Sequence, residues 1–171
     1  MNKFFAILIA TVLALSCTAA FAAAYTHDDD IAFEYDDTIF EVVLDDHADD
    51  EDLIVLNDKD DALGGVYISI HLADLDDGET FPTMDEFAVM PDAKDLTQGE
   101  WNGFKDVVTY TVEYEDGTAE HYFIAPVADD DGEIEDVLTV INGLKALDDE
   151  DAAMARDDQI SAVLDTLRVD D

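Results

Sequence analysis

Alternating apolar and polar positions predict that most of the chain after residue 30 forms β-strands. Strands are predicted over residues 31–35, 39–44, 53–56, 66–72 and 134–141. In the 66–72 segment, Val66, Ile68, Ile70 and Leu72 lie at every second position, so they share one face of the strand. Such a pattern is typical of antiparallel sheets with one buried face.

Residues 104–114 and 119–125 form the clearest pair of strands, and Asp116-Gly117 lies between them. An Asp-Gly pair between two such segments favours a two-residue type I′ turn, because both residues tolerate positive φ. This turn would place Tyr110 opposite Phe123, and Glu113 opposite Glu120. Opposed like charges destabilise a strand pair by about 0.2 to 1 kcal/mol unless ions screen them.

Two segments are predicted to be helical. Thr83-Met-Asp-Glu86 matches a capping box, and Pro91 ends the short helix that it begins. A second helix is predicted near the C-terminus, with Asp148 as its N-cap. Apolar residues recur there at i, i+3, i+4 and i+7, which gives the helix one apolar stripe: Ile160, Val163, Leu164 and Leu167.

This order of elements predicts an α+β fold, an antiparallel β-sheet packed with a short middle helix and a C-terminal helix. Residues 23–171 are expected to form a single domain. Together with Glu100-Trp-Asn-Gly-Phe104 and the closing segment Val163 to Val169, the order resembles the PsbP/DcrB-like fold of small exported bacterial proteins. The resemblance implies a binding or accessory protein without a shared catalytic set, so it assigns no functional residue.

The first 22 residues have the features of a signal peptide. A positive start ending at Lys3 precedes an apolar segment over residues 4–15, and Ala20-Phe21-Ala22 fits the cleavage rule. The protein is therefore expected to be periplasmic or secreted. A lipid anchor at Cys17 is the alternative, but the residues before Cys17 match the lipoprotein pattern less well. Cys17 is the only cysteine, so the processed chain has no disulfide.

The acidic composition is the most unusual property of the chain. It has 45 acidic and seven basic residues, with a formal net charge of −38, yet 49% of its residues are hydrophobic. Such a charge destabilises a compact fold unless it is screened, and about 1 M salt shortens the Debye length to about 3 Å. The composition indicates adaptation to high salt. It also excludes nucleic acid and disfavours anionic membranes as partners.

Acidic loops raise the question of calcium. EF-hand spacing fails around both Gly78 and Gly132, because apolar residues occupy ligand positions. The densest remaining candidate metal ligands are Asp129, Asp130, Asp131 and Glu133. The four histidines, His27, His47, His71 and His121, lack the spacing of a transition-metal site.

Catalytic motifs are absent from the sequence. Ser69 and Ser161 are the serines outside the predicted signal peptide, and neither lies in a nucleophile motif. The leading hypothesis is a non-enzymatic binding or accessory protein with an unidentified protein or small-molecule partner and no required cofactor. The alternative is a calcium- or cation-binding protein, and a carboxylate-based enzyme is a third class. Five aromatic residues are interpreted as sheet packing or, alternatively, a partner surface: Trp101, Tyr110, Tyr114, Tyr122 and Phe123.

Overall fold

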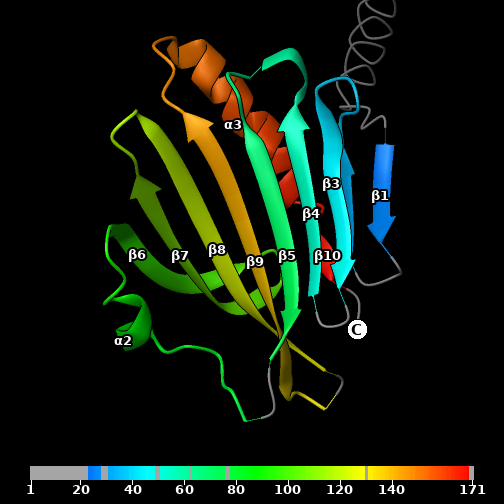
Figure 1. Cartoon of the computed structure of the whole chain (residues 1–171), viewed down its shortest axis with the longest axis vertical. Coiled ribbons are helices and arrows are strands. Elements are labelled where there is room, and N and C mark those ends of the chain that lie inside the picture. The colour runs from blue at the N-terminus through cyan, green and yellow to red at the C-terminus, as the bar shows by residue number, and fades with distance from the viewer. Residues whose placement is uncertain are drawn as a thin grey trace, which may run out of the picture.

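Two antiparallel sheets and one long helix make up the domain (Figure 1). The structure is a computed structural model and describes residues 23–27, 31–48, 51–61, 63–75, 78–129 and 131–169. The strands are β1 (Ala23–His27), β2 (Ile31–Tyr35), β3 (Phe40–Ala48), β4 (Glu51–Asp58), β5 (Tyr67–Asp74), β6 (Ala93–Trp101), β7 (Phe104–Glu113), β8 (Thr118–Ala128), β9 (Ile134–Lys145) and β10 (Arg168–Val169). The helices are the 3-10 turn η1 (Lys59–Asp61), the single turn α2 (Met84–Phe87) and α3 (Glu150–Leu164).

The larger sheet has seven strands in the order β3-β4-β5-β9-β8-β7-β6. All of its neighbouring strands are antiparallel. After β5 the chain crosses to the far edge of the sheet, and the last four strands then return one by one until β9 pairs with β5. Strand β9 therefore lies at the centre of the sheet. The smaller sheet has the order β1-β2-β10.

The smaller sheet and α3 cover one face of the larger sheet, here called the inner face. Figure 1 shows α3 lying behind β9, β5 and β4. The inner face bears alternate residues of each strand, as the sequence pattern predicts. The core includes Ile54, Ile68, Ile70, Leu138 and Val140 from the larger sheet, Ile31 and Phe33 from β2, and the predicted stripe Ile160, Val163, Leu164 and Leu167. The apolar face of the C-terminal helix is thus confirmed for Ile160, Val163 and Leu164, whereas Leu167 is buried but lies beyond the end of α3.

The turn between β6 and β7 holds the end of α3 in place. Asn102 lies in the left-handed region, with a φ of 48°. Its Nδ2 donates hydrogen bonds to the backbone oxygens of Leu164, at 3.1 Å, and of Leu167. Leu164 O also accepts from Leu167 N at 3.2 Å, so the Asn102 amide adds a second donor at the end of α3 and binds the turn that follows it.

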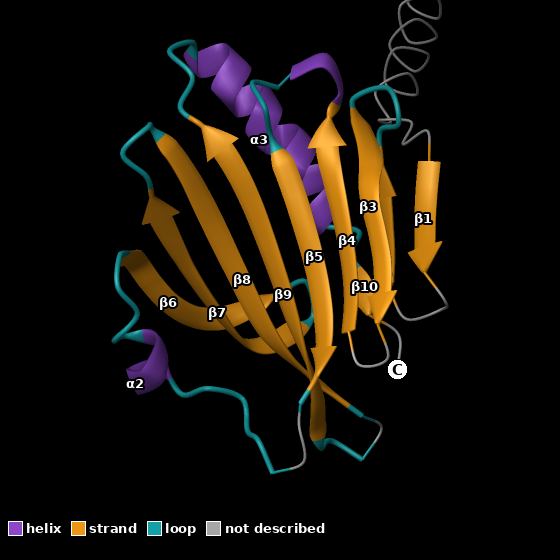
Figure 2. Ribbon diagram, viewed as in Figure 1, coloured by secondary structure: helices purple, strands orange, loops and turns teal. Residues whose placement is uncertain are grey.

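The predicted α+β class is wrong. The described chain is 56% strand and 16% helix, and α3 is its one helix of seven or more residues. Figure 2 shows strands dominating the fold. The predicted middle helix begins with its capping box, since the Glu86 carboxylate accepts from Thr83 N at 2.7 Å and this bond lowers the pKa of Glu86, but it is a single turn. Strands that the pattern did not predict, β1, β6 and β10, make the fold β-rich.

The predicted hairpin register is also wrong, by one residue. Tyr110 lies opposite Tyr122, and Glu113 lies opposite Ala119. The loop has three residues in place of two, because Tyr114 N bonds to Thr118 O at 2.8 Å and Gly117 takes a φ of 83°. One added loop residue shifts every cross-strand pair. The repulsion expected between Glu113 and Glu120 as directly opposed residues is therefore absent.

The start of α3 lies close to its predicted position. Helix α3 has Asp149 as its N-cap, one residue beyond the predicted Asp148, and Asp149 Oδ1 accepts from Ala152 N at 3.0 Å. The predicted signal peptide over residues 1–22, with Cys17, lies outside the described residues. Within the described ranges, no helix is both long and apolar enough to cross a bilayer.

Candidate functional site

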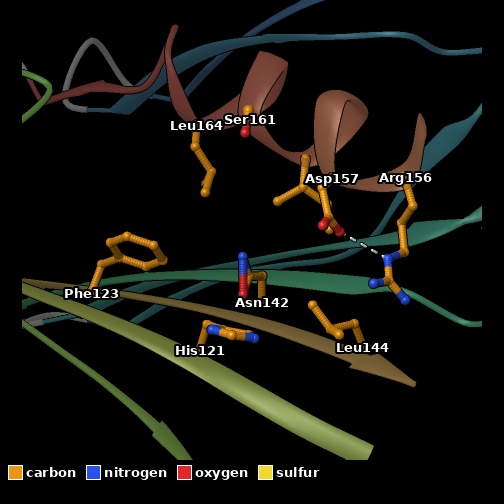
Figure 3. A pocket seen from close by; sticks show the side chains of 9 residues that line it. His121, Phe123, Asn142, Leu144, Arg156, Asp157, Ser161 and Leu164 are labelled. Atoms are coloured by element: carbon orange, nitrogen blue, oxygen red, sulfur yellow. Dashed lines mark hydrogen bonds and ion pairs between the residues drawn. The ribbon is translucent and has the colours of Figure 1, made fainter. Parts of the chain in front are cut away.

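A pocket of about 270 Å³ lies between α3 and the inner face of the larger sheet (Figure 3). Strands β8 and β9 form its floor and α3 forms its roof. The floor residues are His121, Phe123, Asn142 and Leu144, and the roof residues are Arg156, Asp157, Ile160, Ser161 and Leu164.

The polar floor of the pocket interrupts an apolar strand. The inward positions of β9 are Leu138, Val140, Asn142 and Leu144, so one amide replaces an aliphatic side chain at the centre of the sheet. Asn142 pairs directly with His121 of β8. Directly opposed residues on one face of a sheet have Cβ atoms about 4.5 to 5.5 Å apart, so these two polar side chains are neighbours.

Asn142 is buried without a hydrogen-bond partner for its carbonyl oxygen. The side chain is 7% exposed, and in the described part of the chain Oδ1 accepts no hydrogen bond. Figure 3 shows the amide rising from the floor toward α3. An unsatisfied buried acceptor costs about 1 to 3 kcal/mol. Asn142 thus brings an unpartnered acceptor to the wall of the pocket.

The other two buried polar side chains of the described residues are satisfied. Asp58 accepts hydrogen bonds from the backbone nitrogens of Leu63, at 2.7 Å, and Gly65, at 3.2 Å. Arg156 donates from Nη1 to Lys145 O at 2.6 Å and from Nε to Asp157 Oδ1 at 3.1 Å. Because most buried polar groups in folded proteins have partners, Asn142 is the exception that calls for an explanation.

His121 is held in a fixed orientation on the floor. Its Nδ1 lies 3.2 Å from Thr111 Oγ1, on the neighbouring strand β7. Nε2 has no hydrogen bond to another described residue. The ring therefore offers one nitrogen to a ligand, as donor or acceptor according to its tautomer.

The charges at the pocket compensate each other. Arg156 and Asp157 form an ion pair, in which the arginine side chain is 6% exposed and the aspartate side chain is 62% exposed. The guanidinium is thus the buried member of the pair, while the carboxylate faces solvent. Apolar side chains from both layers form the rest of the wall: Phe123, Leu144, Ile160 and Leu164. An apolar pocket with a few convergent polar groups is typical of small-molecule sites.

The pocket does not contain an assembled nucleophile. Ser161 lies on the roof and His121 on the floor (Figure 3), and no hydrogen bond joins them. Ser69, the other serine considered in the sequence, lies on the opposite face of the sheet, where it pairs with Ile141. Nucleophilic catalysis needs a base within hydrogen-bond reach of the attacking hydroxyl.

The predicted metal ligands occupy the turn between β8 and β9. Asp129 Oδ1 accepts from Glu133 N at 2.8 Å, and Asp129 O accepts from Gly132 N at 3.0 Å. The Asp129 carboxylate therefore closes the turn. Asp131 and Glu133 are exposed, and Asp130 lies outside the described residues.

An acidic hollow of about 610 Å³ adjoins this turn. It is lined in part by Asp74, Glu79, Glu133, Glu135 and Asp136. Across the described ranges, no three or more His, Cys, Asp or Glu side chains are arranged to hold a metal ion. The acidic residues of this hollow are consistent with a solvated surface, and the calcium hypothesis stays a prediction.

The two histidines whose side chains the structure describes do not converge. His71 Nε2 lies 2.8 Å from Glu51 Oε2 on the outer face of the sheet, whereas His121 faces inward. The side chains of His27 and His47 are not among those that the structure describes.

The aromatic residues divide between the two faces. Trp101 packs inward against Phe123, with ring centroids 5.0 Å apart. Tyr110 and Tyr122 stack on the outer face at 4.6 Å. Tyr114 is partly exposed. Packing within the sheet therefore accounts for most of the set, which favours the first of the two interpretations.

Glu120 organises the outer face through three tyrosines. Its carboxylate accepts hydrogen bonds from Tyr114 and Tyr122, both at 2.6 Å, and from Tyr67. Burial alone would raise the pKa of Glu120, but the three hydrogen bonds together lower it. The Tyr67 ring lies over Gly143, where a Cβ would meet ring carbons at 2.0 Å. Glycine is therefore required for Tyr67 to cross β9 and reach Glu120.

Comparison with known proteins identifies no relative of this chain. Searches of protein-family models, curated proteins and solved structures find no match to the chain. The resemblance to the PsbP/DcrB-like fold therefore stays a prediction from the sequence.

Proposed function

We propose that this protein is a non-enzymatic binding domain that holds a small molecule between α3 and the sheet. The unpartnered oxygen of Asn142 supports this proposal, because it is buried and belongs to a side chain that lines a cavity. A structural amide at that place would be expected to have a partner. A ligand that donates to Oδ1 would recover the desolvation cost of about 1 to 3 kcal/mol.

The proposed setting is a saline compartment outside the cytoplasm. The predicted signal peptide over residues 1–22 supports export, and the net charge of −38 supports adaptation to salt. A binding domain in such a solvent must recognise its ligand through short-range contacts, because about 1 M salt limits electrostatic range to about 3 Å. The pocket offers hydrogen bonds and apolar contacts, which act at that range.

A fragment screen tests the proposal. Neutral and charged fragments are added to the folded protein in about 1 M NaCl, and binding is measured by the rise in melting temperature and by protein NMR shifts. Hits are then tested on Ser161→Phe, which fills the pocket from α3, and on Ser69→Phe, which places the same side chain on the outer face.

The expected result is that at least one fragment binds the wild type and Ser69→Phe but not Ser161→Phe. A screen without any hit would contradict the proposal. Hits that bind Ser161→Phe as well as wild type would place binding elsewhere, and would contradict it equally.

A further inference from the structure

Resting on the proposed binding function, we infer the chemical class of the ligand: an uncharged molecule that joins an amide-type group, with adjacent N–H and C=O, to a small apolar ring system. The inference follows from the hydrogen-bonding groups, the charge and the size of the pocket.

The buried acceptor requires a donor from the ligand. Asn142 lines the pocket, and its buried Oδ1 has no partner within the described chain. The other atom of its amide, Nδ2, is a donor, and no hydrogen bond from it to a described residue is present. A group that carries N–H beside C=O matches both atoms of a carboxamide, since each is complementary to the other.

An anionic ligand fits this site poorly. A carboxylate has no hydrogen to donate, so it would leave Asn142 Oδ1 unpaired and place a negative oxygen beside it. Arg156, the one buried cation among the described residues, already has Asp157 and the Lys145 carbonyl as partners. The net charge of −38 also opposes the approach of anions.

A cationic ligand fits poorly for a local reason. The protein as a whole attracts cations, but the charge that is buried at the pocket is the guanidinium of Arg156, whereas the carboxylate of Asp157 faces solvent. An ammonium group beside Asn142 would have to lose its water near that positive charge. A neutral amide avoids both penalties.

The wall and the volume define the rest of the molecule. Phe123 and Leu144 below, and Ile160 and Leu164 above, form apolar surfaces on both sides of the pocket. A volume of about 270 Å³ lies just below the range of about 300 to 1,000 Å³ for small-molecule pockets, so the ligand must be small. This space suits one flat ring system with a short polar arm.

Four probes on one skeleton test the inference: indole-3-acetamide, indole-3-acetate, tryptamine and 3-methylindole. Their dissociation constants are measured by isothermal titration calorimetry in about 1 M NaCl, with wild type, Asn142→Leu and Asn57→Leu. Asn57 is exposed on β4, so it provides the same substitution away from the pocket.

The amide is expected to bind wild type about tenfold more tightly than each of the other three probes, since all four carry the indole N–H but only the amide adds a neighbouring donor and acceptor, complementary to Asn142 Oδ1 and Nδ2, without a charge. Asn142→Leu should remove that advantage and leave 3-methylindole binding unchanged or stronger. Asn57→Leu should behave as wild type.

The other outcomes separate this inference from the proposed function. If the carboxylate or the amine binds most tightly and Ser161→Phe abolishes that binding, the ligand class is wrong and the pocket is still a binding site. If none of the four probes binds, the ligand class is overturned as well, and the fragment screen alone decides the proposed function.

Discussion

Replacing Asn142 by leucine should stabilise the ligand-free protein. The side chain is 7% exposed and its Oδ1 has no partner among the described residues, so the native state carries a desolvation cost of about 1 to 3 kcal/mol. Leucine has a similar size, contributes apolar contacts to the flanking residues Val140 and Leu144, and has no polar atom to satisfy. We therefore expect the free energy of unfolding to rise by about 1 to 3 kcal/mol.

Urea unfolding at fixed NaCl concentration measures this change. Trp101 is the only tryptophan and its ring lies 5.0 Å from that of Phe123 in the pocket wall, so its fluorescence reports the same core. A higher midpoint with an unchanged slope means a change in stability alone. Asn57→Leu, at an exposed strand position, should change stability by less than about 0.5 kcal/mol.

A fall in the stability of Asn142→Leu would refute the reasoning. It would mean that the amide is satisfied in solution, for example by ordered water, and that Asn142 is a structural residue. An increase combined with loss of amide binding is the pattern expected of a residue kept for function at the expense of stability.

Four other predictions concern the rest of the molecule. Asn102→Asp places a carboxylate against the two carbonyls at the end of α3, so urea unfolding should show a free energy of unfolding lower by about 2 to 4 kcal/mol. Asn102→Gly removes the same hydrogen bonds but keeps the positive φ accessible, so it should lower that free energy by only about 1 to 2 kcal/mol. The tyrosine hydrogen bonds lower the pKa of Glu120, so they stabilise the fold above its ordinary pKa of 4.5, and this stabilisation is lost as pH falls through the lowered value. As pH falls, the melting temperature should therefore decrease less steeply for Glu120→Gln than for wild type, and equal slopes would contradict this. Burial, followed by the hydrogen bond to Glu120, raises the pKa of Tyr67 and of Tyr122, so their contribution is complete below pH 10 and is lost at higher pH; tyrosinate absorbance should show both rings ionising only as the protein unfolds. Melting temperature should rise steadily with NaCl, and CaCl₂ and MgCl₂ should act alike, so a saturating rise with micromolar calcium alone would instead support a calcium site.

The strand pattern was predictable where the strands are regular and half buried. Residues 66–72 alternate clearly, and they lie in β5 beside the central strand of the larger sheet. Residues 134–141 are apolar at 137–138 and 140–141, and β-branched residues predict the central strand β9 there. Strand β6 was not predictable, because it is an edge strand whose pairing with β7 shifts at two places and whose Asp95 has a φ of 54°. Interruptions of this kind remove the period of two on which the prediction depends.

Long-range contacts explain the other errors. The pairing of β1 with β2 is a contact between short segments, which alternation alone does not specify. The hairpin register depends on the left-handed Gly117 and on a three-residue loop, and an Asp-Gly pair is compatible with two or three loop residues. The length of this loop thus determines which face of the sheet each side chain of β8 occupies.

The candidate site had one signal in the sequence, a polar residue at a position where the pattern requires an apolar one. Asn142 follows Leu138 and Val140 at a spacing of two. A polar residue there predicts either a buried hydrogen bond or a site, and the choice depends on whether α3 supplies a partner. Only the packing of α3 against β8 and β9 shows that it does not.

The composition of the chain and the chemistry of the pocket point to the same kind of recognition. A surface with a net charge of −38 repels anions at low salt, and at high salt its field extends only a few ångströms, so long-range attraction cannot select a ligand. Selectivity must then come from groups that act on contact, which are hydrogen bonds in a desolvated pocket and apolar surface. The ion pair of Arg156 with Asp157 keeps the lining electrically balanced, and Asn142 supplies the directional contact. Salt should therefore strengthen the fold, by screening its surface, while it leaves the recognition of a neutral ligand nearly unchanged.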